Sequence, residues 1–127
     1  MSIYRSSTIR TGLFVGFVFA VVVVCVALLN HGQLAVLQWA TNFCAALPVY
    51  LARKAAAPEL LSYVIFFVYW SSLGGAFGWL MRGPLRFGKS IGVLLAAALV
   101  GVHALAQRQM EQDIVNSIEA LFSGFVP

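Results

Sequence analysis

The chain carries three long apolar runs separated by short polar or basic connections. The runs cover residues 12–29, 60–81 and 90–106, and none of them contains Asp, Glu, Lys or Arg. About 20 apolar residues, at about 1.5 Å per residue in a helix, match the ~30 Å hydrocarbon core of a bilayer. The pattern predicts an all-α integral membrane protein whose three transmembrane helices form one membrane domain over residues 1–127.

A fourth apolar segment, 34–52, is interrupted by polar residues. Gln38, Thr41 and Asn42 fall on one helical stripe, and Pro48 should kink or end the helix. Polar groups in hydrocarbon need hydrogen-bond partners, which makes unaided insertion of this segment unfavourable. We therefore expect an interfacial or re-entrant helix here. The alternative is a protein with four transmembrane helices.

Positive charges orient membrane helices, because Lys and Arg are retained on the cytoplasmic side. The connection 82–89 holds three of them, and Arg5 and Arg10 precede the first run. Counting does not separate the two topologies, since both place five basic residues inside and three outside. The density of the 82–89 cluster favours three spans. We then expect a bacterial inner-membrane protein with a cytoplasmic N-terminus and a periplasmic C-terminus.

The composition supports the membrane class and argues against nucleic-acid binding. Hydrophobic residues make up 61% of the 127 residues and charged residues 9%, whereas a soluble domain carries about 25% charged residues. The net charge of +4 comes mostly from basic residues beside the apolar runs. Contacts with lipid headgroups explain these charges better than a nucleic-acid partner does.

Small residues within the runs predict close contacts between helices, because they let two backbones approach. GxxxG spacing occurs in the first run and again in the second, where two serines come just before it. The predicted helix-packing residues are Gly12, Gly16, Ser71, Ser72, Gly74, Gly75 and Gly78.

The third run continues into an amphipathic tail, 107–123. Its polar face is acidic, with Glu111, Asp113 and Glu119, rather than rich in Lys or Arg as in helices that lie on membranes. This face suits a protein partner better than an anionic lipid surface. The predicted partner-binding residues of the apolar stripe are Met110, Ile114, Ile118, Leu121 and Phe122.

Groups for chemistry are scarce. The sequence has no phosphate-binding loop, nucleophile elbow or HExxH motif, and the three runs lack the Asp, Glu, Lys and Arg residues that ion-coupled carriers commonly use. His31 and His103, expected near the outer ends of their helices, are the ligand candidates. Cys25 and Cys44 lie in apolar sequence and are expected to be buried thiols, with a disulfide as the alternative. We expect no catalytic residue, no metal and no cofactor.

These observations favour a non-enzymatic accessory or assembly subunit of a larger membrane complex. Its partners would be other integral membrane subunits, or further copies of itself, within the lipid bilayer. The alternative is a self-assembling small pore or carrier, such as a holin-like protein or a lipid-carrier flippase, in which the polar stripe of segment 34–52 faces water.

Overall fold

The protein folds as four helices in a computed structural model that describes residues 2–82 and 85–123, and only the backbone of residues 2–6. The helices are α1 (Ser2–Asn30), α2 (Ala35–Lys54), α3 (Glu59–Arg82) and α4 (Gly88–Ser123). The described residues contain no strand, which confirms the all-α prediction. All four helices are long and apolar enough to cross a membrane. The side chain of Arg5 and two residues of the basic connection, Gly83 and Pro84, lie outside the described residues.

A tight turn reverses the chain after α1. His31 and Gly32 adopt positive φ values of 40° and 77°, and Gln33 N–H donates to the Asn30 carbonyl at 2.8 Å. The Asn30 side chain is buried and bonds the backbone of Leu34 twice, accepting from its N–H at 3.0 Å and donating to its carbonyl at 3.1 Å. This one side chain therefore ends α1 and fixes where α2 begins.

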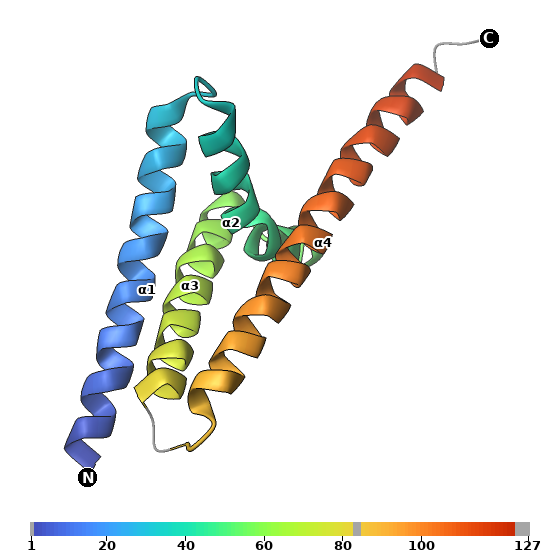
Figure 1. Cartoon of the computed structure of the whole chain (residues 1–127). Helices are drawn as coiled ribbons and strands as arrows, with labels where there is room; N and C mark the ends of the chain where they lie inside the picture. The colour runs from blue at the N-terminus through green and yellow to red at the C-terminus, as the bar shows by residue number, and fades with distance from the viewer. Residues whose placement is uncertain (1, 83–84, 124–127) are drawn as a thin grey trace.

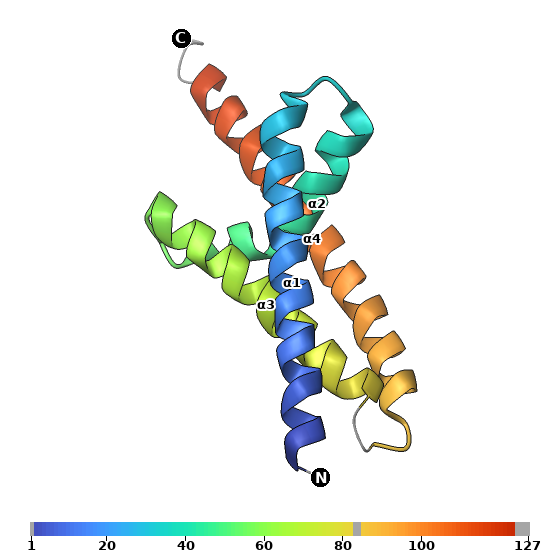
Figure 2. The same cartoon turned by 90° about the vertical axis from the view of Figure 1, so that its left-hand side faces the viewer.

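Helices α1 and α3 pack along their lengths in opposite directions. Gly12 of α1 lies against Gly74 of α3, and Gly16 of α1 lies against Trp70 of α3. Residue numbers therefore rise by four along α1 while they fall by four along α3. The two helices are antiparallel and cross at an angle (Figure 2). Further along, Ala20 and Val23 of α1 join Phe66 of α3 in the buried apolar cluster.

Helix α4 is one continuous helix of 36 residues, so the third apolar run and the amphipathic tail form a single rod. At about 1.5 Å per residue it is about 54 Å long. Its first half lies beside α3, and its last turns run away from the other helices (Figure 1). Helix α2 starts beside the end of α1, contains Pro48, and contacts α4 as well as α1 and α3 (Figure 1).

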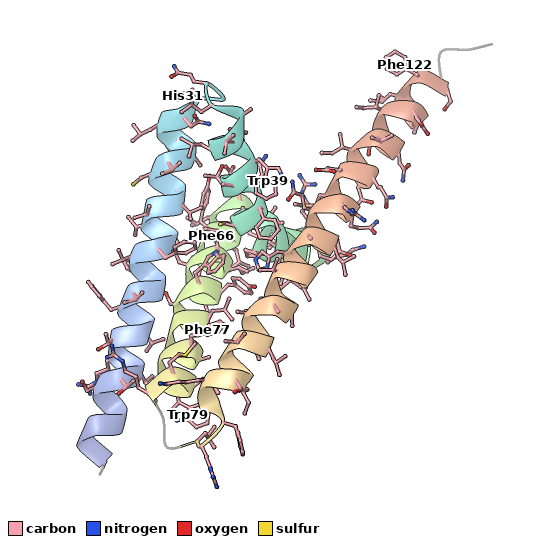
Figure 3. The ribbon with its side chains drawn as sticks, viewed as in Figure 1. His31, Trp39, Phe66, Phe77, Trp79 and Phe122 are labelled. Atoms are coloured by element: carbon pink, nitrogen blue, oxygen red, sulfur yellow. The ribbon has the colours of Figure 1, made fainter. Side chains whose placement is uncertain are left out.

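The molecule has two distinct ends. The start of α1, the end of α3 and the start of α4 lie together at one end (Figures 1 and 2). That end carries the exposed Arg10, Arg82, Arg86 and Lys89. Trp79 lies toward it, and Trp39 lies toward the opposite end (Figure 3). Tryptophans near both ends of an apolar bundle are typical of the two aromatic belts at membrane interfaces.

Candidate functional site

The surface between α1 and α3 is a contact between two helix backbones. A methyl group added to Gly12 would collide with the Gly74 carbonyl, and one added to Gly74 would collide with the Gly12 carbonyl. A methyl group on Gly78 would come within 3.0 Å of the Thr8 carbonyl oxygen and 3.2 Å of the Gly12 Cα. The two predicted GxxxG pairs therefore face each other, and the backbones of α1 and α3 touch because no side chain keeps them apart.

The remaining small residues divide between this contact surface and its edge. Gly75 is buried beside the Leu13 side chain, and the Ser71 backbone lies against Gly16. Ser72 is exposed, so the structure places it away from this surface. The sequence pattern did not indicate that the α1 pair meets the α3 pair, because it carries no information on helix direction.

A buried histidine joins α4 to α2 and α3. The His103 side chain is 2% exposed, and its ring lies tilted against those of Phe43, Tyr69 and Trp70 with centroid distances of 5.6–5.7 Å. Its Nδ1 lies 2.9 Å from the Leu99 carbonyl oxygen. A carbonyl oxygen only accepts, so we assign the proton to Nδ1. The Tyr69 hydroxyl, 3.4 Å from Nε2, then donates to Nε2. Both ring nitrogens therefore have hydrogen-bond partners within the bundle.

Pro48 removes one backbone hydrogen bond from α2, and the side chain of Trp70 replaces it. In a helix the N–H of residue 48 would donate to the carbonyl of Cys44, but proline has no N–H. The indole Nε1–H of Trp70 donates to that same carbonyl oxygen at 3.3 Å. The Pro48 ring is fully buried. A carbonyl of one helix is therefore paired with a side chain from another, and the bond ties α2 to α3.

The polar side chains of α2, Gln38, Thr41 and Asn42, form hydrogen bonds within their own helix. Gln38 Nε2–H donates to Asn42 Oδ1 at 3.1 Å, and the Thr41 hydroxyl lies 3.0 Å from the Leu37 carbonyl oxygen. These bonds supply the partners that polar groups need in an apolar environment. Each of the three side chains therefore makes at least one hydrogen bond within α2.

The other ligand candidates lie elsewhere. His31 is exposed on the turn after α1 (Figure 3), whereas His103 is buried among aromatic rings, and no described contact joins them. The two cysteines are free. Cys44 is half-buried, but Cys25 is exposed on α1, so the expectation of two buried thiols is wrong for Cys25. A lipid-facing position explains the apolar sequence around it equally well.

The tail extends α4 as an exposed helix. Every residue from 111 to 123 is exposed, including Ile118, Leu121 and, at its far end, Phe122 (Figure 3). Gln107 and Gln109 donate to Glu111 and Asp113 one turn on, at 3.3 and 3.2 Å. Such i,i+4 bonds stabilise a helix that has little tertiary support. The two earlier residues of the stripe, Met110 and Ile114, line a cleft beside the end of α2.

Two elements of this site were not predicted from the sequence. Phe43 and Tyr69 were not identified as neighbours of His103, because their contact depends on how three helices cross. The bond from Trp70 was not predicted either, although the sequence did carry a signal for half of it: a proline inside a helix always leaves the carbonyl four residues earlier without its usual donor.

Comparison with known proteins gives no family: no protein-family model, no curated protein and no solved structure matches the chain.

Proposed function

We propose that this protein is a non-enzymatic accessory or assembly subunit of a larger membrane complex, and that it recruits its partner through the tail. The observation that carries the proposal is the exposed apolar stripe on the last turns of α4. Ile118, Leu121 and Phe122 are 47–69% exposed on a helix that leaves the bundle. If the tail leaves the bilayer, an apolar stripe of this kind is favourable only when another surface covers it.

The antiparallel register of α1 and α3 supports a topology with three transmembrane helices. In a four-span protein α1 and α3 would cross in the same direction. Opposite directions require the segment between them, α2, to begin and end on one side of the membrane. Helix α2 then lies in the outer interface, where the bond from Trp70 and the bonds along its polar stripe reduce the cost of partial insertion.

The distribution of charge supports the same arrangement. Four exposed basic residues lie at the end where α1 starts, three of them in the short connection 82–89, as expected for the cytoplasmic side. Three others, Arg53, Lys54 and Arg108, lie on α2 and α4 away from that end. At the opposite end of the apolar part of α4, Gln107 and Glu111 line a cleft together with Arg53 of α2. The first charged residue after the apolar part of α2, Arg53, thus lies at the same cleft as the charged residue Glu111 of α4. We propose a cytoplasmic N-terminus and a periplasmic tail in a bacterial inner membrane.

A reporter fused after residue 127 tests this topology. We expect alkaline phosphatase to be active there and a fluorescent protein to be dark, because three spans place the C-terminus outside. A fusion after residue 86, within the basic connection, is the matched control and should give the opposite pair of signals. An inactive phosphatase and a bright fluorescent protein at the C-terminus would require an even number of spans and would contradict the proposal.

Replacing Ile118 with aspartate tests the tail. We expect the yield of unlike chains that co-purify in mild detergent to fall at least about tenfold, because an apolar residue at the centre of an interface contributes more than about 1.4 kcal/mol to binding. Mass spectrometry of the purified material measures that yield. Asn116→Asp adds the same charge on an exposed position of the same helix and should leave the yield unchanged.

Two outcomes of this experiment would contradict the subunit role. One is a wild-type protein that purifies only as a homo-oligomer and leaks dye from vesicles, which would indicate a pore. The other is loss of the partner in both variants, which would show that added charge, and not the apolar stripe, controls the association.

A further inference from the structure

A cavity between α1, α2 and α3 has the features of a ligand site, and no residue of the α4 tail lines it. Its volume is about 320 Å³, within the usual range for small-molecule pockets. Val24 and Ala27 of α1 and Phe66 of α3 give it apolar walls. Glu59 and Tyr63, from the first turns of α3, lie at its edge.

The carboxylate of Glu59 is the charged group of this cavity. None of the residues that line it is Lys or Arg, and within the described part of the chain Glu59 forms no ion pair. Two neighbouring polar atoms already have partners: the Ser62 hydroxyl donates to the Pro58 carbonyl at 3.3 Å, and Asn42 Oδ1 accepts from Gln38. The cavity therefore combines one unpaired negative charge with an apolar interior.

We propose that this cavity binds an amphiphile through an ammonium head and one hydrocarbon chain. The head would pair with Glu59 and lie near the ring of Tyr63, which attracts cations through its π face. The chain would lie along Val24, Ala27 and Phe66.

Binding of dodecyltrimethylammonium to the full-length protein in maltoside micelles tests the charge. Protein-free micelles give the background. We expect Glu59→Gln to weaken binding about tenfold, since one ion pair near a protein surface contributes on the order of 1.4 kcal/mol. Glu119→Gln removes an acid from the exposed tail and should not change the affinity. Equal binding by Glu59→Gln and the wild type, or equal binding of uncharged dodecanol, would overturn the proposal.

A second pair of variants tests the apolar part. Ala27 is exposed and lines the cavity, so Ala27→Phe should fill it without disturbing the fold and should reduce binding about tenfold. Ala97→Phe places the same ring on the exposed face of α4 and should have no effect. Unchanged binding in Ala27→Phe would place the amphiphile elsewhere. This pair is independent of the tail, so its outcome does not depend on the proposed accessory role.

Native mass spectrometry then identifies the source of the amphiphile. Adducts of phosphatidylethanolamine that are retained in the wild type and lost in Glu59→Gln would identify a lipid headgroup. Binding of dodecyltrimethylammonium without such adducts would identify a soluble amphiphile. Phosphatidylglycerol adducts that survive in Glu59→Gln and exceed those of phosphatidylethanolamine would contradict an ammonium-binding cavity.

Discussion

Replacing Gly16 with alanine is expected to destabilise the packing of α1 on α3 by about 1–3 kcal/mol, the usual cost of overfilling a close contact. The added methyl group would meet the backbone of Trp70, with its carbonyl carbon at 2.9 Å and the Cα of Ser71 at 3.0 Å. These atoms belong to a helix backbone and cannot rotate away as a side chain would. The two helices must separate, and the contacts on either side of Gly16 weaken with them.

Gly101→Ala is the matched control, and we expect it to raise the free energy of unfolding instead of lowering it. Gly101 is an exposed helical residue of α4, and a methyl group added there meets nothing within 4 Å. Alanine restricts the unfolded chain more than glycine and favours the helix, so we expect a gain of about 0.5–1 kcal/mol. The same substitution therefore tests the contact separately from helix propensity.

Unfolding in mixed maltoside and dodecyl sulfate micelles, followed by circular dichroism, measures both variants. A free energy of unfolding that rises in Gly16→Ala as it does in Gly101→Ala would show that the backbones of α1 and α3 do not touch. Gly12→Ala provides an independent repeat at the neighbouring turn, because its methyl group would meet Gly74.

Hydropathy predicted the helices because it reports local composition. The apolar runs 12–29, 60–81 and 90–106 each lie within one helix, and segment 34–52 lies within α2 except for its first residue. The continuity of the third run with the tail also followed from an unbroken helical period. The stretch 2–11 is helical as well, although its polar composition gave no apolar run to indicate it. A polar stretch extends a helix at little cost per residue once the apolar part has nucleated it.

The arrangement of the helices was less accessible. Small residues indicated which faces approach closely, but Gly12 and Gly16 could have met any neighbour, including a second copy. The antiparallel register depends on where α2 leads the chain, and that is a property of the whole bundle. The surroundings of His103 follow from the same arrangement, since Phe43, Tyr69 and Leu99 come from three helices.

Replacing Trp70 with phenylalanine is expected to destabilise the bundle by about 1–2 kcal/mol beyond any loss of packing. The substitution keeps an aromatic ring but removes the N–H that donates to the Cys44 carbonyl oxygen. That carbonyl then has no donor, because Pro48 cannot supply one, and an unpaired buried carbonyl costs about 1–3 kcal/mol. In membranes the average contribution of one hydrogen bond is nearer 0.6 kcal/mol, which favours the lower half of that range.

The cause can be isolated by combining this change with Pro48→Ala. An alanine at position 48 restores the backbone N–H that the helix would normally direct to Cys44, so the indole is no longer the sole donor. We expect the cost of Trp70→Phe to fall by about 1 kcal/mol in the Pro48→Ala background, a coupling typical of residues that share one partner. The same unfolding titration on the wild type, both single variants and the double variant measures it.

Additive costs would contradict the shared carbonyl. They would mean that Trp70 stabilises the bundle through its ring contacts with Phe19, Tyr69 and His103 alone. Coupling would instead assign a purpose to a proline in a segment that is apolar enough to cross the membrane. By removing one backbone donor, Pro48 makes the Cys44 carbonyl of α2 depend on the Trp70 side chain of α3, and this bond holds α2 against the bundle.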